Sequence, residues 1–348
     1  MTVPPSSGPQ DPVFVNPLAV FRGRRPDAPS WFSDALAAAP ERRRVPVRDA
    51  DIEVLIWGKR GAPGLLFLHG LGAHADWWSH IAPFFSARYR VAALSWSGMG
   101  GSDWRDNYDV EIYLEEILAT AQASGLFESS ERPLTVAHSF GGLMLLAATA
   151  AFGERLKGAV VVDSFLRPDG RWHLPPSSRR TMPVYASLEA ALARFRFMPS
   201  QACANLFIAD HIARASLKPV PLQEQRDAGW TWRFDPRCAG GLPRVPIAAC
   251  LTSPPCPLAF IAGARSPLTN AAVEDFVRGT APQGVPWIKI PDSDHHVMVD
   301  QPLALIAALF ALFESWPLGP AGVTDCIVKG REEVLNASGS SNVTKLSK

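Results

Sequence analysis

The sequence predicts an α/β protein, with a mostly parallel central sheet, helices on both faces of the sheet and a helical cap inserted between two strands. Three observations predict this class. From residue 51, short runs rich in β-forming residues alternate with longer stretches of helical periodicity. Several of the short runs are apolar throughout, as strands covered on both faces must be. The alternation breaks between residues 165 and 257, an interval too long for a structureless loop.

Residues 1–45 are expected to form an irregular N-terminal arm, because prolines at positions 4, 5, 9, 12, 17, 26 and 29 remove backbone amide donors. Within the arm, the stretch PSWFSDALAAA can form one docked helix. The first ten residues, MTVPPSSGPQ, have neither the basic nor the apolar region of a secretory signal. No apolar run approaches the length of about 20 residues that a membrane span needs. We therefore expect a cytoplasmic protein that does not bind membranes.

Seven runs are predicted as strands, and they lie in the two parts of the core, residues 46–164 and 258–315. In order they are DIEVLIWG (51–58), GLLFLHG (64–70), RVAALSW (90–96), LTVAH (134–138), GAVVVD (158–163), PLAFIAG (257–263) and VPWIKI (285–290). The stretches DVEIYLEEILATAQASG (109–125) and GGLMLLAATAAFG (141–153) have helical length. Each ends at a glycine, where a helix C-cap with positive φ is expected.

Residues 165–257 are expected to form the cap. SLEAALARFRFM (187–198) has apolar residues at helical spacing, and Ser187 can cap its N-terminus. LFIADHIARASL (206–217) is a second helical run, and an aromatic alternation at Trp230, Trp232 and Phe234 follows. Residues 316–348 are small, polar and aperiodic, and are expected to form a flexible C-terminal tail.

Composition excludes several classes of function. The 348 residues carry a formal net charge of +1 and 47% are hydrophobic, so there is no global bias toward nucleic acid or an anionic membrane. Five cysteines, at 203, 238, 250, 256 and 326, form no C-x-x-C pair and leave an odd count, so neither a disulfide framework nor a zinc site is predicted. We expect no metal, no cofactor, a small-molecule substrate, and a monomer or a homodimer.

The stretch TVAHSFGG (135–142) predicts a sharp turn from strand to helix with Ser139 at the turn. Small residues at 137, 141 and 142 are what such a turn needs, because larger side chains would meet neighbouring backbone. Ser139 at this place is a candidate nucleophile. The alternative is a serine that only caps the helix and satisfies its free amides.

Two backbone amides are candidates for stabilising an oxyanion. His69 and Gly70 end an early strand, and the amide of Leu71 follows where the chain turns toward the carboxyl edge of the sheet. The amide of Phe140 follows Ser139 at the start of a helix, where the helix dipole adds a favourable field. For His69 we expect a structural role, in which the ring holds the loop.

The stretch IPDSDHHVMVDQP (290–302) follows the last predicted strand and contains the candidate base. A serine needs a group that takes its proton, and an imidazole with a pKa near neutrality is suited to this. Of the two adjacent histidines, the distance in sequence back from the DQP triplet (300–302) favours His295. His296 is expected to be an adjacent residue that faces the surface or the cap.

Four motifs in order, FLHG, LSWSGMGGSDW, AHSFGG and HHVMVDQP, make the chain resemble the α/β-hydrolase superfamily over about residues 50–315. The resemblance implies the α/β-hydrolase fold, with the cap inserted after the sixth strand. In that fold the catalytic residues follow one another as Ser, then Asp or Glu, then His, which agrees with Ser139 preceding His295.

The sequence position of the third catalytic residue, the acid, departs from the common pattern of the superfamily. Many members carry an Asp after the strand that follows the cap, but IAGARSP places Ser266 there. The other place for the acid is the end of the strand after the nucleophile helix, where GAVVVDSFLRP offers Asp163, as in the similar haloalkane dehalogenases. The alternative for Asp163 is a turn residue at a strand end. Asp292 and Asp294 are weaker candidates, because they are too close to His295 in sequence.

These residues predict a serine hydrolase that cleaves a small to medium, largely apolar carboxylic ester or lactone through an acyl-enzyme, with a Ser139–His295–Asp163 triad. Superfamily members that open epoxides or remove halogens use an Asp nucleophile instead, so the serine favours acyl substrates. Trp78, Trp230 and Trp232 are candidates for lining the substrate pocket. Two alternatives remain: hydrolysis of a carbon–carbon bond in a ring-fission diketone by the same triad, and a ligand-binding or receptor-like protein with negligible turnover.

Overall fold

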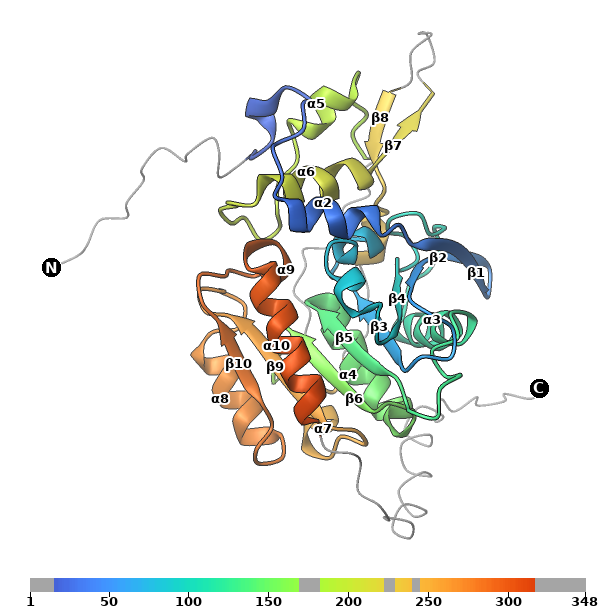
Figure 1. Ribbon diagram of the computed structural model, residues 1–348, viewed down its shortest axis with the longest axis vertical. Helices are drawn as coiled ribbons and strands as arrows, with labels where there is room; N and C mark the ends of the chain where they lie inside the picture. The colour runs from blue at the N-terminus through green and yellow to red at the C-terminus, as the bar shows by residue number, and fades with distance from the viewer. Residues whose placement is uncertain (1–15, 169–181, 222–228, 240–244, 317–348) are drawn as a thin grey trace, which may run out of the picture. The chain divides into compact units, whose positions relative to one another are not determined.

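The computed structural model describes residues 16–168, 182–221, 229–239 and 245–316. Eight strands form one central sheet in the order β1-β2-β4-β3-β5-β6-β9-β10 (Figure 1). Their bounds are β1 (Glu41–Val47), β2 (Ala50–Trp57), β3 (Gly64–Leu68), β4 (Arg90–Leu94), β5 (Leu134–His138), β6 (Gly158–Val162), β9 (Leu258–Gly263) and β10 (Trp287–Ile290). Antiparallel pairing in this sheet is limited to β2 with β1 and β2 with β4, so the predicted mostly parallel sheet is confirmed.

The register of the sheet brings the candidate residues to one edge. His138 at the end of β5 pairs with Val162 at the end of β6, so Ser139 and Asp163 leave neighbouring strands at the same level. On the other side, β9 pairs with β6, and Gly263 at its end pairs with Ile290 of β10. The loops after β5, β6, β9 and β10 therefore start from one stretch of the carboxyl edge.

Helices cover both faces of the sheet, as predicted. On one face α3 (Val110–Ala123) packs against α4 (Phe140–Phe152), α4 against α7 (Ile247–Thr252), and α7 against α8 (Ala271–Thr280). On the other face, Phe67 of β3 stacks on Trp78 of η2 (Ala75–Trp78), and Phe85 of η3 (Ala82–Phe85) stacks on Phe310 of α10 (Pro302–Ser315). The remaining core turns are η4 (Gly153–Arg155) and α9 (Val297–Asp300). Within the part of the chain that the structure describes, no helix is both long and apolar enough to span a bilayer.

The two glycines predicted to cap helices behave differently. Gly125 follows α3 with φ 76°, as expected for a left-handed C-cap. The expectation for Gly153 is wrong, since its φ is −60° and the chain continues directly into η4. A second helical turn there leaves no need for a left-handed residue.

The predicted arm contains two elements, η1 (Ala19–Phe21) and α2 (Ser30–Ala37), and the first residues of β1. The ring of Phe32 in α2 lies 4.9 Å from Phe207 and 5.9 Å from His80, so the predicted docked helix forms. The strand β1 was not expected because its sequence, ERRRVPV, is mostly charged and contains proline. Such a strand is compatible with a sheet edge, where half of its backbone groups face away from the ladder. Residues 1–15 of the arm and 317–348 of the predicted tail lie outside the described residues.

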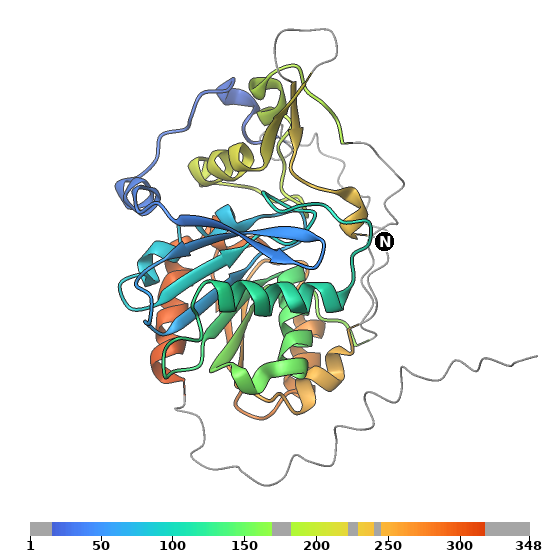
Figure 2. The same ribbon diagram turned by 90° about the vertical axis from the view of Figure 1, so that its right-hand side faces the viewer.

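The cap follows β6, the sixth strand, and is not purely helical. It contains α5 (Leu188–Leu192), α6 (Leu206–Ala215), η5 (Pro236–Ala239), and the antiparallel ribbon of β7 (Leu217–Val220) and β8 (Gly229–Trp232). The amide of Ala190 donates to Ser187 Oγ at 3.1 Å, so Ser187 caps α5 as predicted. The aromatic alternation that begins at Trp230 is therefore the period of a strand. Figures 1 and 2 show these elements gathered at one end of the sheet.

Two sets of hydrogen bonds attach the cap to the core. After β8, the Gly100 amide donates to Arg233 O at 2.9 Å, and Tyr108 Oη donates to Asp235 Oδ2 at 2.8 Å. Before α6, Asn205 Nδ2 donates to Val299 O at 2.8 Å. The cap is thus attached to the loops that follow β4 and β10.

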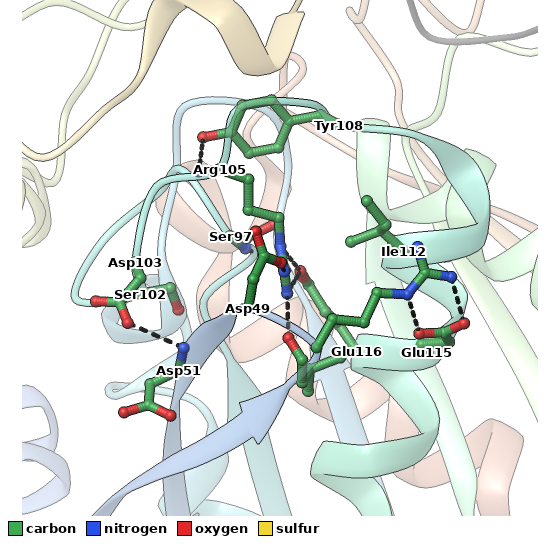
Figure 3. A network of polar contacts seen from close by, with 12 residues as sticks. Asp49, Asp51, Ser97, Ser102, Asp103, Arg105, Tyr108, Ile112, Glu115 and Glu116 are labelled. Carbon is green, nitrogen blue, oxygen red and sulfur yellow. Dashed lines mark hydrogen bonds and ion pairs between the residues drawn. The ribbon is translucent and has the colours of Figure 1, made fainter.

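A buried ion pair fixes the loop that carries Tyr108 (Figure 3). Arg105 Nη2 lies 3.2 Å from Glu116 Oε1 of α3, with the two side chains 1% and 0% exposed. The Ser97 amide donates to Glu116 Oε2 at 3.0 Å, and Arg105 also contacts the carboxylate of Asp49 at the surface. Burial raises the pKa of Glu116 to about 7. The ion pair therefore connects α3 to the loop whose Tyr108 is hydrogen-bonded to the cap.

We expect Glu116→Ala to lower the free energy of unfolding by about 3 kcal/mol, because it leaves Arg105 buried without its main partner. Urea unfolding at pH 8, where Glu116 is ionised, measures this difference. The control is Glu115→Ala, which breaks an exposed pair with Arg48 at 2.6 Å and should change the midpoint little. Equal midpoints for the two variants would contradict the importance of the buried pair.

Candidate active site

Ser139 occupies a strained turn between β5 and α4. Its φ of 54° and ψ of −120° are unusual for a residue with a side chain. The Ser139 amide donates to Val162 O at 3.0 Å, and Ser164 Oγ donates to Ser139 O at 2.7 Å. The turn is therefore held in this conformation from the neighbouring strand.

Glycine is needed at both positions that the sequence singled out after Ser139. A Cβ atom added at Gly141 would lie 2.6 Å from His69 O, and one added at Gly142 would overlap Ser164 Oγ. The start of α4 thus packs directly against the backbone of the loop after β3. This contact places the N-terminus of α4 beside that loop.

His295 connects Ser139 to Asp163. Its Nε2 lies 3.0 Å from Ser139 Oγ, and its Nδ1 lies 2.8 Å from Asp163 Oδ1. The three residues are 8%, 2% and 1% exposed in the order Ser139, His295 and Asp163. Because an ionised carboxylate can only accept, Nδ1 donates to Asp163 and Nε2 is left to accept from the serine hydroxyl.

Asp163 lies where the sequence placed the acid, and Ser266 lies beside it. Asp163 has φ 44°, a conformation that Asp tolerates better than most residues. Its carboxylate accepts from Ser266 Oγ at 2.7 Å, from Thr269 Oγ1 at 2.9 Å and from the Gly263 amide at 2.7 Å. Asp292 and Asp294, the weaker candidates, both face Arg265, at 3.2 and 3.9 Å.

Two further histidines surround His295. His138 Nε2 donates to His295 O at 3.0 Å, with the two rings 4.6 Å apart. The ring of His296 lies 4.8 Å from that of His295, and its Nδ1 lies 2.6 Å from Gln201 Oε1 of the cap. His296 is buried and faces the cap. Burial lowers the pKa of His138 and of His296 well below the ordinary value, so both rings are neutral neighbours of His295.

His69 holds the loop after β3, as expected. Its Nδ1 donates to Gly70 O at 2.7 Å, and its Nε2 accepts from the Trp96 amide at 3.0 Å. Burial lowers the pKa of His69 to about 3, which keeps this hydrogen-bonding pattern fixed. A Cβ atom added at Gly70 would lie 3.1 Å from Ser139 Cβ, so the loop passes against Ser139. The amide of Leu71 follows directly, and that of Phe140 begins α4.

The three tryptophans predicted to line a pocket lie in different places. Trp78 is fully buried and stacks on Phe67 at 4.8 Å, on the face of the sheet opposite α4, so it is a core residue. Trp230 and Trp232 are half-buried on β8 of the cap, and Trp232 lies 6.2 Å from Tyr185. The sequence did not distinguish Trp78 from Trp77, because adjacent tryptophans in one turn carry no periodic signal.

Trp77 and Gln201 contact His296, the neighbour of His295, and sequence reasoning missed both. The ring of Trp77 lies 5.3 Å from His296 and 6.0 Å from Phe197 of the cap. Gln201 accepts from the His296 amide at 3.0 Å and donates to Asp300 at 2.9 Å. No local pattern marks these positions, because the cap and the core supply them separately. Among the described residues, no three His, Cys, Asp or Glu side chains are grouped so as to hold a metal ion.

Comparisons with known proteins agree with this architecture. The model of the alpha/beta hydrolase family matches residues 65–309. A pimeloyl-[acyl-carrier protein] methyl ester esterase of Edwardsiella ictaluri is 30% identical over 115 residues, 32% of this chain and 42% of that protein. Epoxide hydrolase 4 of Mus musculus is 26% identical over 109 residues, 30% of this chain and 29% of that protein. The matched parts thus span less than half the length of these relatives.

A solved structure extends the similarity to most of the chain. The crystal structure of a hypothetical protein from Pseudomonas aeruginosa aligns with a TM-score of 0.64 at 23% identity, covering 79% of this chain and 99% of that one. At this identity the likeness shows a shared fold. The family match over residues 65–309 covers more than half of the chain and shows that it belongs to the α/β hydrolase family.

Proposed function

We propose that this α/β hydrolase is a serine hydrolase that cleaves a small to medium, largely apolar carboxylic ester or lactone through an acyl-enzyme. The observation that supports this proposal is the position of His295, 3.0 Å from Ser139 Oγ and 2.8 Å from Asp163 Oδ1. Hydrogen bonds of this length satisfy the geometric requirement for general-base activation of a serine.

In the proposed mechanism, Ser139 Oγ attacks the carbonyl carbon while His295 Nε2 takes the hydroxyl proton. Asp163 stabilises the imidazolium through Nδ1. The amides of Leu71 and Phe140 donate to the oxyanion, at the loop and the helix N-terminus that meet beside Ser139. His295 returns the proton to the leaving alcohol. Water, activated by the same imidazole, then hydrolyses the acyl-enzyme.

The nucleophile favours an acyl substrate over an epoxide, although a relative is an epoxide hydrolase. A serine alkoxide that opens an epoxide would form an ether, which water does not hydrolyse under mild conditions. A carboxylate nucleophile forms an ester, which can turn over. With Ser139 at the turn, we expect ester turnover and no epoxide turnover.

The cap side of the site favours an apolar substrate. Trp77, Phe197 and the neutral ring of His296 pack together within 6.0 Å of one another, and the His296 ring lies 4.8 Å from that of His295. Trp230 and Trp232 with Phe195 extend the aromatic character of the cap, and Trp232 lies 6.3 Å from Phe195. The ligand-binding alternative was favoured by the lack of an acid at 266, whereas the contact of 2.8 Å between Asp163 and His295 supports the enzyme proposal.

The test combines labelling with a substrate panel. The purified protein is treated with a fluorophosphonate, and the modified peptide is identified by mass spectrometry. Nitrophenyl esters of graded acyl length, simple lactones, a ring-fission diketone and an epoxide are then assayed. We expect phosphonylation of Ser139 and turnover of esters or lactones. Turnover of the diketone alone would favour carbon–carbon bond cleavage, and neither labelling nor turnover would overturn the hydrolase proposal.

Gly141→Ala is expected to lower kcat on the best ester by about 10²-fold, because the added methyl group forces the loop of His69 away from α4. Steady-state kinetics and a melting curve measure the effect on activity and on folding. Gly279→Ala in α8 is the matched control, since a Cβ atom there has nothing within 4 Å. It should keep wild-type kcat and slightly raise stability. Wild-type kcat in Gly141→Ala would contradict the role of this close contact.

A further inference from the structure

The carboxylate of Asp163 receives four hydrogen bonds from two chain segments. Oδ1 accepts from Ser266 Oγ at 2.7 Å and from His295 Nδ1 at 2.8 Å. Oδ2 accepts from the Gly263 amide at 2.7 Å and from Thr269 Oγ1 at 2.9 Å. An ionised carboxylate has about four acceptor positions, so all of them are used.

The hydroxyl of Ser266 has two hydrogen-bond partners, of which only Asp163 can accept its proton. The amide of Leu268 lies 3.2 Å from Ser266 Oγ and can only donate to it. The single proton of Ser266 is therefore free to point at Asp163 Oδ1, the same oxygen that meets His295. Ser266 and Thr269 are only 7% and 6% exposed, so water does not readily replace either hydroxyl.

The two hydroxyls come from a different strand end than Asp163. They lie in the turn after β9, in which the Ser266 amide donates to Gly263 O at 3.0 Å. Asp163 lies after β6, and its amide donates to Ile261 O of β9 at 2.7 Å. The rigid pairing of β6 with β9 thus sets where the donors stand relative to the carboxylate.

We propose that Ser266 is a positioning residue of the triad, which with Thr269 fixes the plane of the Asp163 carboxylate so that Oδ1 faces His295 Nδ1. The inference rests on the proposed function, because it assigns Ser266 a part in that triad. Without the Ser266 hydroxyl, the carboxylate loses one of the two donors on Oδ1. The carboxylate group can then rotate. Because one donor fewer stabilises its negative charge, that charge acts more strongly on the His295 imidazolium.

The titratable and charged groups around His295 decide how a pH profile of kcat/KM is interpreted. His138 from β5 and His296 beside it are neutral, and Asp163 is the carboxylate in contact. Arg265 in the same turn as Ser266 is paired with Asp292 and Asp294 at the surface. Asp300, whose pKa burial raises to about 6, accepts from the Asp294 amide beside His295 at 2.8 Å. Asp300 is the same in every variant, so the difference in the acid limb of kcat/KM between a variant and the wild type is expected to report the pair of His295 and Asp163.

The experiment compares Ser266→Ala, Ser266→Thr and Thr269→Val with the wild type. We expect Ser266→Ala to lower kcat about tenfold with KM nearly unchanged, because one hydrogen bond to a charged group is lost. Its acid limb should move to higher pH, since the less stabilised carboxylate favours the imidazolium. Ser266→Thr keeps the hydroxyl and should retain activity, and Thr269→Val should give a smaller loss. Wild-type kcat and pH profile in Ser266→Ala would overturn the proposal.

Ser124→Ala is the matched control, because Ser124 is 1% exposed and its Oγ has no hydrogen-bond partner among the described residues. It should behave like the wild type. A second measurement, the low-field proton resonance of His295 Nδ1, needs no substrate. If the wild type turns over nothing but Ser266→Ala shifts or broadens this resonance, the proposed function fails and the positioning role stands. An unchanged resonance in folded Ser266→Ala would refute the positioning role.

Discussion

Ser139→Ala is expected to lower kcat for ester hydrolysis by about 10⁶-fold, because it removes the hydroxyl that lies 3.0 Å from His295 Nε2 and that attacks the carbonyl in the proposed mechanism. The remaining rate would come from the oxyanion amides and from substrate binding. KM should change little, since the hydroxyl contributes mainly to the transition state. Single-turnover kinetics with a nitrophenyl ester, together with the loss of fluorophosphonate labelling, measure the effect.

Ser124→Ala is the control for this prediction. Ser124 is 1% exposed, its Oγ has no hydrogen-bond partner among the described residues, and it lies outside the turn that carries Ser139. Labelling of Ser139 should persist in this variant. Substantial ester turnover by a folded Ser139→Ala would show that another group is the nucleophile.

Asp163→Asn is expected to lower kcat by about 10⁴-fold, the scale seen when a triad Asp is neutralised in a serine protease. All four partners of the carboxylate are donors, so the amide NH₂ of Asn must face two of them in either orientation. With NH₂ toward His295, Nδ1 must become an acceptor, and Nε2 then carries the proton and cannot take that of Ser139. Steady-state kinetics with a check of folding by circular dichroism measure the loss.

The double variant Asp163→Asn with Ser266→Asp moves the carboxylate from the end of β6 to the turn after β9 and tests whether it can still serve His295. Ser266 Oγ lies 2.7 Å from Asp163 Oδ1, so the longer Asp side chain at 266 can bring a carboxylate oxygen toward His295. We expect at least about tenfold recovery over Asp163→Asn alone, and a loss when Ser266→Asp is made in the wild type, where two carboxylates would repel. Full activity in Asp163→Asn would mean that another acid serves His295.

Several elements of the fold could be predicted because they depend on local patterns. All seven predicted strands and the helices α3 and α4 form, since hydrophobic period and apolar runs report which faces are buried. The charged strand β1 and the β7–β8 ribbon were not predicted. Their stability depends on neighbours, namely the edge position beside β2 and the pairing within the cap.

The candidate site likewise has features that local sequence patterns predict and features that depend on tertiary contacts. The sequence by itself determined the turn around Ser139, because glycines at 141 and 142 are needed wherever helix and loop approach this closely. The spacing from the DQP triplet indicated His295, and the resemblance to the α/β-hydrolase superfamily indicated Asp163. Only the tertiary structure decided that Ser266 stands beside Asp163 as a donor, that Trp77 and Gln201 flank His296, and that Trp78 belongs to the core. The physical reason is that these contacts join residues far apart in sequence. They depend on the pairing of β6 with β9 and on the docking of the cap, which no local pattern of residues specifies.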